Sequence, residues 1–286
     1  MLVTFWGTRG SIPTPGHGTQ RYGGNTSCVE IRSSSTTVIC DAGTGLRALG
    51  EQLDSEGRPG PLYMFFSHPH WDHIQGFPFF TPAYDPKKKI LVFGGEDEEP
   101  VHGLLSGQMQ PRYFPVRFEN LGADIRQGSF RKDATEVGNI QVRRFKQHHP
   151  GGSFGYTFLT EGAKIVYSTD NELDALITSE KKDGLRKLPA EIVERYRDAD
   201  LLIADAQYTD ADYAHKKGWG HARATTAVDL AIQAGVKQLA LFHHDPLQTD
   251  PQMEEKVRTC QERARRLGGE HLLVFAAREE ITLKLP

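Results

Sequence analysis

Four side chains of metal-binding type fall within six residues of this sequence. The segment Ser67-His68-Pro69-His70-Trp71-Asp72-His73 directly follows the apolar run Leu62-Tyr63-Met64-Phe65-Phe66. A short apolar and aromatic run that ends at Ser and Pro predicts a buried β-strand, so we expect the four side chains on a loop at its end. In extended chain the first two histidines point to the same side. The adjacent aspartate and third histidine diverge, so they suit a second centre.

Other predicted strand ends carry the same kinds of side chain. His149, Asp170 and His243 each follow or close an apolar, strand-like segment. At the last of these the neighbour His244 is an alternative, and we prefer His243 because it is the residue at which the strand ends. Imidazole together with carboxylate suits Zn²⁺, with Mn²⁺ or Fe²⁺ as alternatives. The sequence therefore predicts a metal site built on strand ends.

The elements that must position these residues alternate between short apolar strands and helices. Leucines recur at helical spacing over residues 46–53, and an apolar helical face over residues 225–234 is closed by Gly235. No linker or low-complexity break interrupts the chain, which predicts a single domain over residues 1–286. Strands are expected at residues 1–6, 28–31, 37–40, 62–66, 90–95, 140–146, 154–160, 163–168, 201–204, 239–242, 272–276 and 281–285, and a last helix at residues 251–267.

Three segments carry little periodic signal. Residues 101–130 mix glycine, proline and aromatic residues, and we interpret them as an insertion near the active site. Residues 179–200 are highly charged, so we expect an exposed helix around residues 190–196 with no chemistry of its own. The acidic run Glu96-Asp97-Glu98-Glu99 is expected to be a solvated turn.

The composition limits the classes of partner and the compartment. A chain of 286 residues with a net charge of −3 lacks the basic surface of an obligate nucleic-acid binder. Three cysteines and an uncharged N-terminus that does not resemble a signal peptide predict a cytoplasmic protein with reduced thiols. No apolar run approaches the roughly 20 residues that cross a bilayer, so no membrane association is expected.

The histidine-rich segment resembles the metal-binding signature of the metallo-β-lactamase superfamily. The turns at residues 7–13, 24–27 and 41–45 are similar to those of the ribonuclease Z and phosphoribosyl cyclic phosphodiesterase branch. The resemblance therefore covers nearly the whole chain. It implies an α/β fold of the four-layer αββα kind, in which two mixed β-sheets are flanked by helices.

The resemblance also implies a dinuclear metal site with seven ligands. One metal would take His68, His70 and His149, the other Asp72, His73 and His243, and Asp170 would bridge them. His149 matches the His-Pro-Gly-Gly loop of the family better than His148 does. Two divalent ions, Zn²⁺ foremost, can lower the pKa of a bridging water towards about 7 and so supply hydroxide at neutral pH. Asp72 would orient this hydroxide as well as bind metal.

His221 is the candidate general acid. An alkoxide leaving group needs a proton where a thiolate does not, and a histidine outside the metal ligands is the natural donor. His221 resembles the histidine that this branch carries between the bridging aspartate and the last ligand, and Asp205 could orient it. The alternative is a structural histidine that is hydrogen-bonded to a nearby carbonyl or carboxylate. The segment Ala222-Arg223-Ala224 departs from the Ser or Thr usual after this histidine.

These features favour a metal-dependent phosphodiesterase that cleaves a small diester, such as a cyclic nucleotide or a cyclic ribose phosphate. A long RNA is not expected as substrate, because the chain lacks the basic arm with which ribonuclease Z holds tRNA. One alternative is a thioester or lactone hydrolase of the glyoxalase II kind, and another is a non-catalytic nucleotide-sensing module. The resemblance also carries the expectation of a homodimer.

Overall fold

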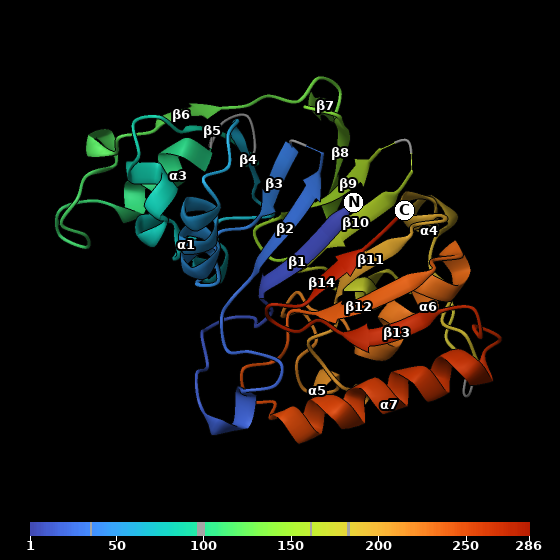
Figure 1. Ribbon diagram of the computed structural model, residues 1–286. Helices are drawn as coiled ribbons and strands as arrows, with labels where there is room; N and C mark the ends of the chain where they lie inside the picture. Colours follow the sequence, from blue (N-terminus) through green and yellow to red (C-terminus); the bar gives the residue numbers. More distant parts are fainter. Residues whose placement is uncertain (35, 96–100, 161, 182–183) are drawn as a thin grey trace. The chain divides into compact units, whose positions relative to one another are not determined.

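The computed structural model describes residues 1–34, 36–95, 101–160, 162–181 and 184–286 (Figure 1). The acidic run Glu96-Asp97-Glu98-Glu99 lies outside these residues. The chain forms two compact units, the first made of residues 1–15, 23–141 and 278–286 and the second of residues 16–22 and 142–277. The expectation of a single domain over residues 1–286 stays a prediction.

The first sheet has the strand order β14-β1-β2-β3-β4-β5-β6. Its strands β3, β4, β5 and β6 run parallel, and Cys40 of β3 pairs with Phe65 of β4, which pairs with Phe93 of β5. The carboxyl ends of β3 and β4 therefore meet at one edge of the sheet. The strands are β1 (Leu2–Gly7), β2 (Cys28–Ser33), β3 (Thr36–Cys40), β4 (Leu62–Phe65), β5 (Lys89–Phe93), β6 (Asp124–Gln127) and β14 (Thr282–Lys284).

Helices α1 (Leu46–Glu56) and α3 (Val101–Gln108) pack in the first unit, and the short helix α2 (Trp71–Ile74) follows β4. The leucines expected on one face of α1 are buried in its core, which confirms that helix. Residues 101–130 contribute α3 and β6, and Val101 and Leu105 join the same core. This segment is therefore part of the unit's packing, while its proximity to an active site stays a prediction.

The second sheet has the strand order β13-β12-β11-β10-β9-β8-β7, and the boundary between the units falls within its last two strands. Strands β10, β11, β12 and β13 run parallel, with Ser168 paired to Ala204 and Ala204 paired to Leu241. Their carboxyl ends share one edge. The strands are β7 (Ala134–Val137), β8 (Ile140–Gln147), β9 (Ser153–Leu159), β10 (Lys164–Ser168), β11 (Leu201–Asp205), β12 (Gln238–Phe242) and β13 (Leu273–Ala276).

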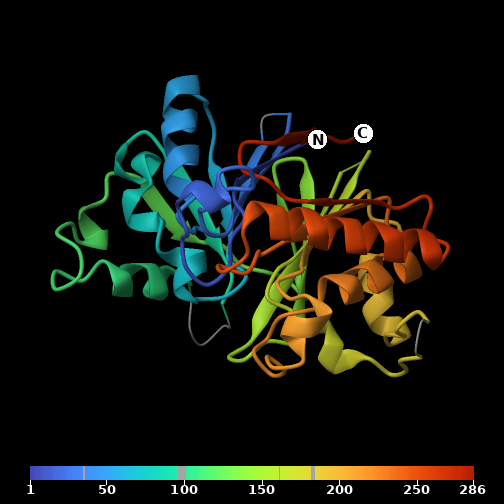
Figure 2. The ribbon, with the colours of Figure 1, turned by 90° about the horizontal axis from the view of Figure 1, so that it is seen from below.

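The described residues of the second unit include the α-helices α4 (Ala190–Tyr196), α5 (Asp210–Tyr213), α6 (Ala224–Ala234) and α7 (Asp250–Arg266). The long helix α7 lies beside α6 and β13, as the orange-red helix of Figure 2 shows. Gly235 ends α6 with a φ of 66°, the left-handed conformation that favours glycine, as predicted. Helix α6 packs on β11 and β12. This packing of α6 positions the residues directly before the helix, which include His221.

Most predicted strands and helices are confirmed, and so is the fold class of two mixed β-sheets flanked by helices. The helix expected around residues 190–196 is confirmed as α4, but the expectation that it is exposed is wrong, because Val193 and Tyr196 are buried, as is Arg186 before it. The charged side chains around them hid this packing. None of the helices in the described part of the chain is long and apolar enough to cross a membrane.

Candidate metal centre

The first unit gathers His68, His70, Asp72 and His73 at the end of β4. The ring of His68 lies 4.3 Å from those of His70 and His73, and Nε2 of His73 lies 3.2 Å from Oδ2 of Asp72. His70 is exposed while the other three are buried. The sequence placed all four on a loop, whereas Asp72 and His73 belong to α2. This short helix turns both side chains back toward the strand end.

Asp41 orients this group, although its role was not predicted. It follows β3 and has a φ of 59°, an uncommon conformation for a residue with a side chain. Nδ1 of His73 donates to its Oδ2 at 2.8 Å, and the backbone N–H of Ser67 donates to its Oδ1 at 2.7 Å. A carboxylate on Nδ1 fixes the imidazole tautomer and leaves Nε2 to bind a metal. Its place after a strand was the signal that could have revealed it.

Ser11 orients Asp72. Its backbone N–H donates to Oδ2 of Asp72 at 2.7 Å, and its own φ is 67°. The glycine-rich turn at residues 7–13 thus delivers a peptide N–H to the carboxylate. This contact could not be predicted from residue types, because a backbone N–H is present at almost every residue.

The second unit places Asp170 and His243 side by side. His243 directly follows β12, and Asp170 comes two residues after the end of β10. Both have a positive φ, 52° for Asp170 and 58° for His243. Nε2 of His243 lies 3.2 Å from Oδ1 of Asp170, and Nε2 of His149 lies 3.8 Å from Oδ2. Asp170 and His243 are each 1% exposed. Strained backbone at two buried strand ends is typical of functional positions.

In two pairs of neighbouring histidines, His148 with His149 and His243 with His244, the sequence left a choice of ligand, and the structure shows where each ring lies. Nδ1 of His149 donates to the carbonyl of Gly220 at 2.9 Å, whereas His148 is exposed. His244 is buried, and its Nε2 donates to the carbonyl of Ala277 at 2.8 Å. The structure thus places His149 and His243 beside Asp170 and directs the ring of His244 to a backbone carbonyl.

His221 lies in the same group and is held by Asp205. Its Nδ1 is 2.7 Å from Oδ2 of Asp205, so the expected contact between the two residues is present. Its ring stacks on that of His243 with centroids 4.9 Å apart. Donor atoms of Asp170, Asp205, His221 and His243 all lie within 4.8 Å of one another. The geometry therefore allows His221 to act either as a ligand or as a proton donor, because a ring nitrogen that binds a metal carries no proton.

Asp205 is a rigid acceptor. Its Oδ1 accepts the backbone N–H groups of Gln207 at 3.0 Å and Ala222 at 3.3 Å, and its Oδ2 also accepts the N–H of Asn171 at 3.3 Å. Tyr208 presents its ring edge to His221 at 5.7 Å. Burial, and then the charge of Asp205, raise the pKa of Tyr208. Its hydroxyl therefore stays protonated at neutral pH.

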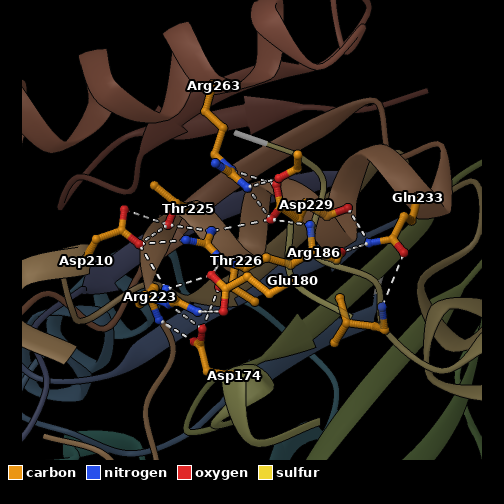
Figure 3. A network of polar contacts seen from close by, with 12 residues as sticks. Asp174, Glu180, Arg186, Asp210, Arg223, Thr225, Thr226, Asp229, Gln233 and Arg263 are labelled. Carbon is orange, nitrogen blue, oxygen red and sulfur yellow. Dashed lines mark hydrogen bonds and ion pairs between the residues drawn. The ribbon is translucent and has the colours of Figure 1, made fainter. Parts of the chain in front are cut away.

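A network of ion pairs supports the start of α6, directly after His221 (Figure 3). Arg223 donates its backbone N–H to Asp174 at 2.8 Å, and buried Arg186 lies 3.3 Å from Asp229. Arg263 reaches the same Asp229 oxygen at 2.7 Å. Burial raises the pKa of Asp174. These partners come from distant parts of the chain, so the network could not be predicted from local sequence.

The types of donor side chain fit divalent metal ions. Imidazole and carboxylate groups are the protein ligands of Zn²⁺, and neighbouring carboxylates or carbonyls hold the other ring nitrogen of His73, His149 and His221. Seven predicted ligands and the predicted acid thus form two groups, one with His68, His70, Asp72 and His73 and the other with His149, Asp170, His221 and His243.

Comparisons with known proteins give a consistent result. The model of the beta-lactamase superfamily domain matches residues 36–244. A ribonuclease Z of Haloarcula marismortui is 26% identical over 276 residues, with 85% of this chain and 86% of the relative covered. A ribonuclease Z of Methanosarcina mazei is 25% identical over 297 residues, with 87% and 89% covered.

Solved structures resemble the chain over nearly its whole length. The metallo-beta-lactamase fold protein YhfI from Bacillus subtilis has a TM-score of 0.68 at 16% identity, with 99% of both chains covered. A diphosphatase from the PhnP family has a TM-score of 0.67 at 18% identity, with 100% of this chain and 98% of that chain covered. Human tRNase Z, short form, has a TM-score of 0.64 at 19% identity, with 100% of both covered. At these identities the likeness shows a shared fold.

Proposed function

The chain belongs to the beta-lactamase superfamily and is a metal-dependent hydrolase, and from this premise we propose that it cleaves a phosphodiester of a small substrate. The class we favour is a cyclic nucleotide or cyclic ribose phosphate. The observation that carries this proposal is the pair of His221 and Asp205, 2.7 Å apart beside Asp170 and His243. A positioned imidazole is what an alkoxide leaving group requires and a thiolate does not.

We propose that two divalent ions are held by the seven predicted ligands. The division into His68, His70 and His149 for one ion, Asp72, His73 and His243 for the other, and Asp170 for both rests on the resemblance. The donor types, and the hydrogen bonds that hold the other ring nitrogens of His73 and His149, support metal binding by these side chains. Zn²⁺ is the first choice, with Mn²⁺ or Fe²⁺ as alternatives. Such ions, when bound, acidify water and stabilise negative charge on phosphate oxygens.

The side chains of the protein would then orient the attacking water and supply the proton for the leaving group. Ser11 holds the carboxylate of Asp72, which orients the attacking water. Asp205 accepts from Nδ1 of His221, so the proton delivered to the leaving oxygen is the one on Nε2. The P–O bond to the leaving group breaks as that oxygen takes the proton. The carboxylate of Asp205 also favours the imidazolium form that must be present before the transfer.

Two features near this group support a nucleotide-like substrate. Trp219, two residues before His221, is 61% exposed and offers a face on which a base can stack. A cavity of about 220 Å³ is lined by Lys146, His148 and Arg195 among others. His148 is the neighbour in the chain of the proposed ligand His149, so a further anionic group of the substrate can bind in this cavity, close to His149.

RNA processing is the second candidate, because several curated relatives carry the name ribonuclease Z. The net charge of −3 favours the small substrate. The homodimer and the cytoplasmic location stay predictions, the first from the resemblance and the second from the cysteine content.

A substrate panel tests the proposal. The zinc-loaded protein is assayed with 2′,3′-cyclic nucleotides, a precursor tRNA and a glutathione thioester, each with and without chelator. We expect the highest metal-dependent kcat/KM on a cyclic diester. Preferential cleavage of precursor tRNA would establish the RNA candidate, and preferential thioester hydrolysis would overturn the phosphodiesterase proposal.

A further inference from the structure

Glu172 is a buried carboxylate that no step described so far uses. It lies two residues after Asp170 and is 2% exposed. Its Oε1 accepts the backbone N–H of Gly218 at 2.7 Å and the hydroxyl of Tyr213 at 2.8 Å, and its Oε2 accepts the N–H of Gly220 at 2.9 Å. Three donors therefore converge on one carboxylate. Two of them belong to the loop of residues 218–221, which ends at His221.

The same loop also holds His149. The carbonyl of Gly220 accepts from Nδ1 of His149 at 2.9 Å, while the N–H of Gly220 donates to Glu172. Gly220 has a φ of 91°, and a Cβ there would clash with the ring of His149. Only glycine allows this close approach. One residue thus connects the carboxylate of Glu172 to the imidazole of His149.

The backbone of Glu172 makes a second connection to the histidine loop. Its N–H donates to the carbonyl of His148 at 2.8 Å. Burial and the hydrogen bond to Glu172 raise the pKa of Tyr213, so its hydroxyl remains a donor at neutral pH. Glu172 is therefore bound from the loop, from α5 and from the residue that precedes His149.

We infer that Glu172 is a positioning residue that fixes His149 and His221 at once through the loop of residues 218–221. The inference rests on the proposed function, in which His149 binds metal and His221 donates a proton. A carboxylate is required, because all its partners are donors. Partners of metal-ligating histidines that lie outside the ligand set typically contribute about 10- to 100-fold in metal affinity or activity.

The substitution Glu172→Gln tests this with little change in volume. Its amide group keeps one acceptor oxygen and turns NH₂ toward either the N–H of Gly220 or the two donors on the other side. We expect the apparent Kd for Zn²⁺ to rise about 10-fold. The substrates are the methyl and p-nitrophenyl esters of thymidine 5′-phosphate, both assayed at saturating Zn²⁺. We expect kcat for the methyl ester to fall roughly 10- to 100-fold. We expect kcat for the p-nitrophenyl ester to fall by less than about 3-fold, since p-nitrophenolate leaves without a proton.

Trp219 gives a readout that does not depend on turnover. It lies between Gly218 and Gly220 and is one of three tryptophans. Its acrylamide quenching is obtained by subtracting the signal of the matching Trp219→Phe protein. We expect easier quenching and lower anisotropy in Glu172→Gln, because the loop has lost an anchor. Tyr213→Phe, which keeps the carboxylate, is expected to show a smaller change of the same kind.

Glu191→Gln on the exposed side of α4 is the matched control and should behave as the wild type. Equal losses on both diesters at saturating Zn²⁺, or unchanged Zn²⁺ affinity together with unchanged Trp219 quenching, would overturn the positioning role. If the wild type cleaves no diester, the proposed function fails. In that case Zn²⁺ affinity and Trp219 quenching still decide whether Glu172 anchors the loop.

Discussion

Replacing Asp205 with Asn probes the proton donor while leaving its surroundings nearly the same size. In the native protein Oδ2 of Asp205 accepts from Nδ1 of His221 at 2.7 Å and from Asn171, while Oδ1 accepts from Gln207 and Ala222. Whichever side the amide nitrogen takes, two N–H donors face another donor. Hydrogen bonds to charged groups contribute about 1.5–3 kcal/mol each, and two of the four are long. We expect the free energy of unfolding to fall by about 3 kcal/mol.

The effect on catalysis should depend on the leaving group. Without the carboxylate, His221 loses the charge that favours its imidazolium form, and a general acid typically contributes about 10²- to 10⁴-fold. The assay compares kcat/KM for the methyl and p-nitrophenyl esters of thymidine 5′-phosphate, at zinc saturation and well below the unfolding midpoint. We expect a loss of roughly 10²-fold or more on the methyl ester and only a small loss on the other. Equal losses on both esters in folded Asp205→Asn protein would refute the assignment of His221 as the acid.

Other properties follow from the same structure. Chelation should lower the free energy of unfolding, and free Zn²⁺ at 100 times its Kd should restore about 2.7 kcal/mol, measured by urea titration; an unchanged midpoint would argue against bound metal. Arg195→Gln should reduce kcat/KM about 10-fold for thymidine 5′-(p-nitrophenyl phosphate) that carries a 3′-phosphate, and not for the parent ester. Arg197→Gln, whose native side chain pairs with Glu194, should leave both unchanged. Burial raises the pKa of the Cys260 thiol to about 12 and those of Cys28 and Cys40 above their usual range, so all three thiols stay protonated at pH 8. A disulfide reagent should therefore label none of them before unfolding and three after it, and fast labelling of the native protein would contradict this burial.

The strands, the longer helices and the ligands at strand ends could be predicted from the sequence, because each depends on a local pattern. Period-2 and apolar runs located most strands, and the helical spacing that ends at Gly235 located α6. Ligand types directly behind such runs pointed to His68, Asp170 and His243. These signals work because a strand end fixes where its next side chains lie. The structure then groups those residues within each unit.

Residues that act through long-range contacts could not be found in this way. Asp41 contacts His73 across 32 residues, and Glu172 contacts Gly220 across 48. The place of Asp41 directly after a strand marks it as a candidate, but neither local sequence shows which residue the carboxylate contacts. The buried Arg186 lay in a charged stretch that resembles an exposed surface, because its partner Asp229 comes 43 residues later. Short elements such as α5 carry too few residues for a periodic signal.

The most direct test of the central claim is turnover of bis(p-nitrophenyl) phosphate by protein reconstituted with Zn²⁺ or Mn²⁺, against a chelated control. Metal content per chain is measured in the same samples. We predict cleavage that rises with metal content, reaches its maximum at two ions per chain and disappears on chelation. Two bound ions per chain without cleavage of any diester, together with hydrolysis of a thioester, would contradict the account.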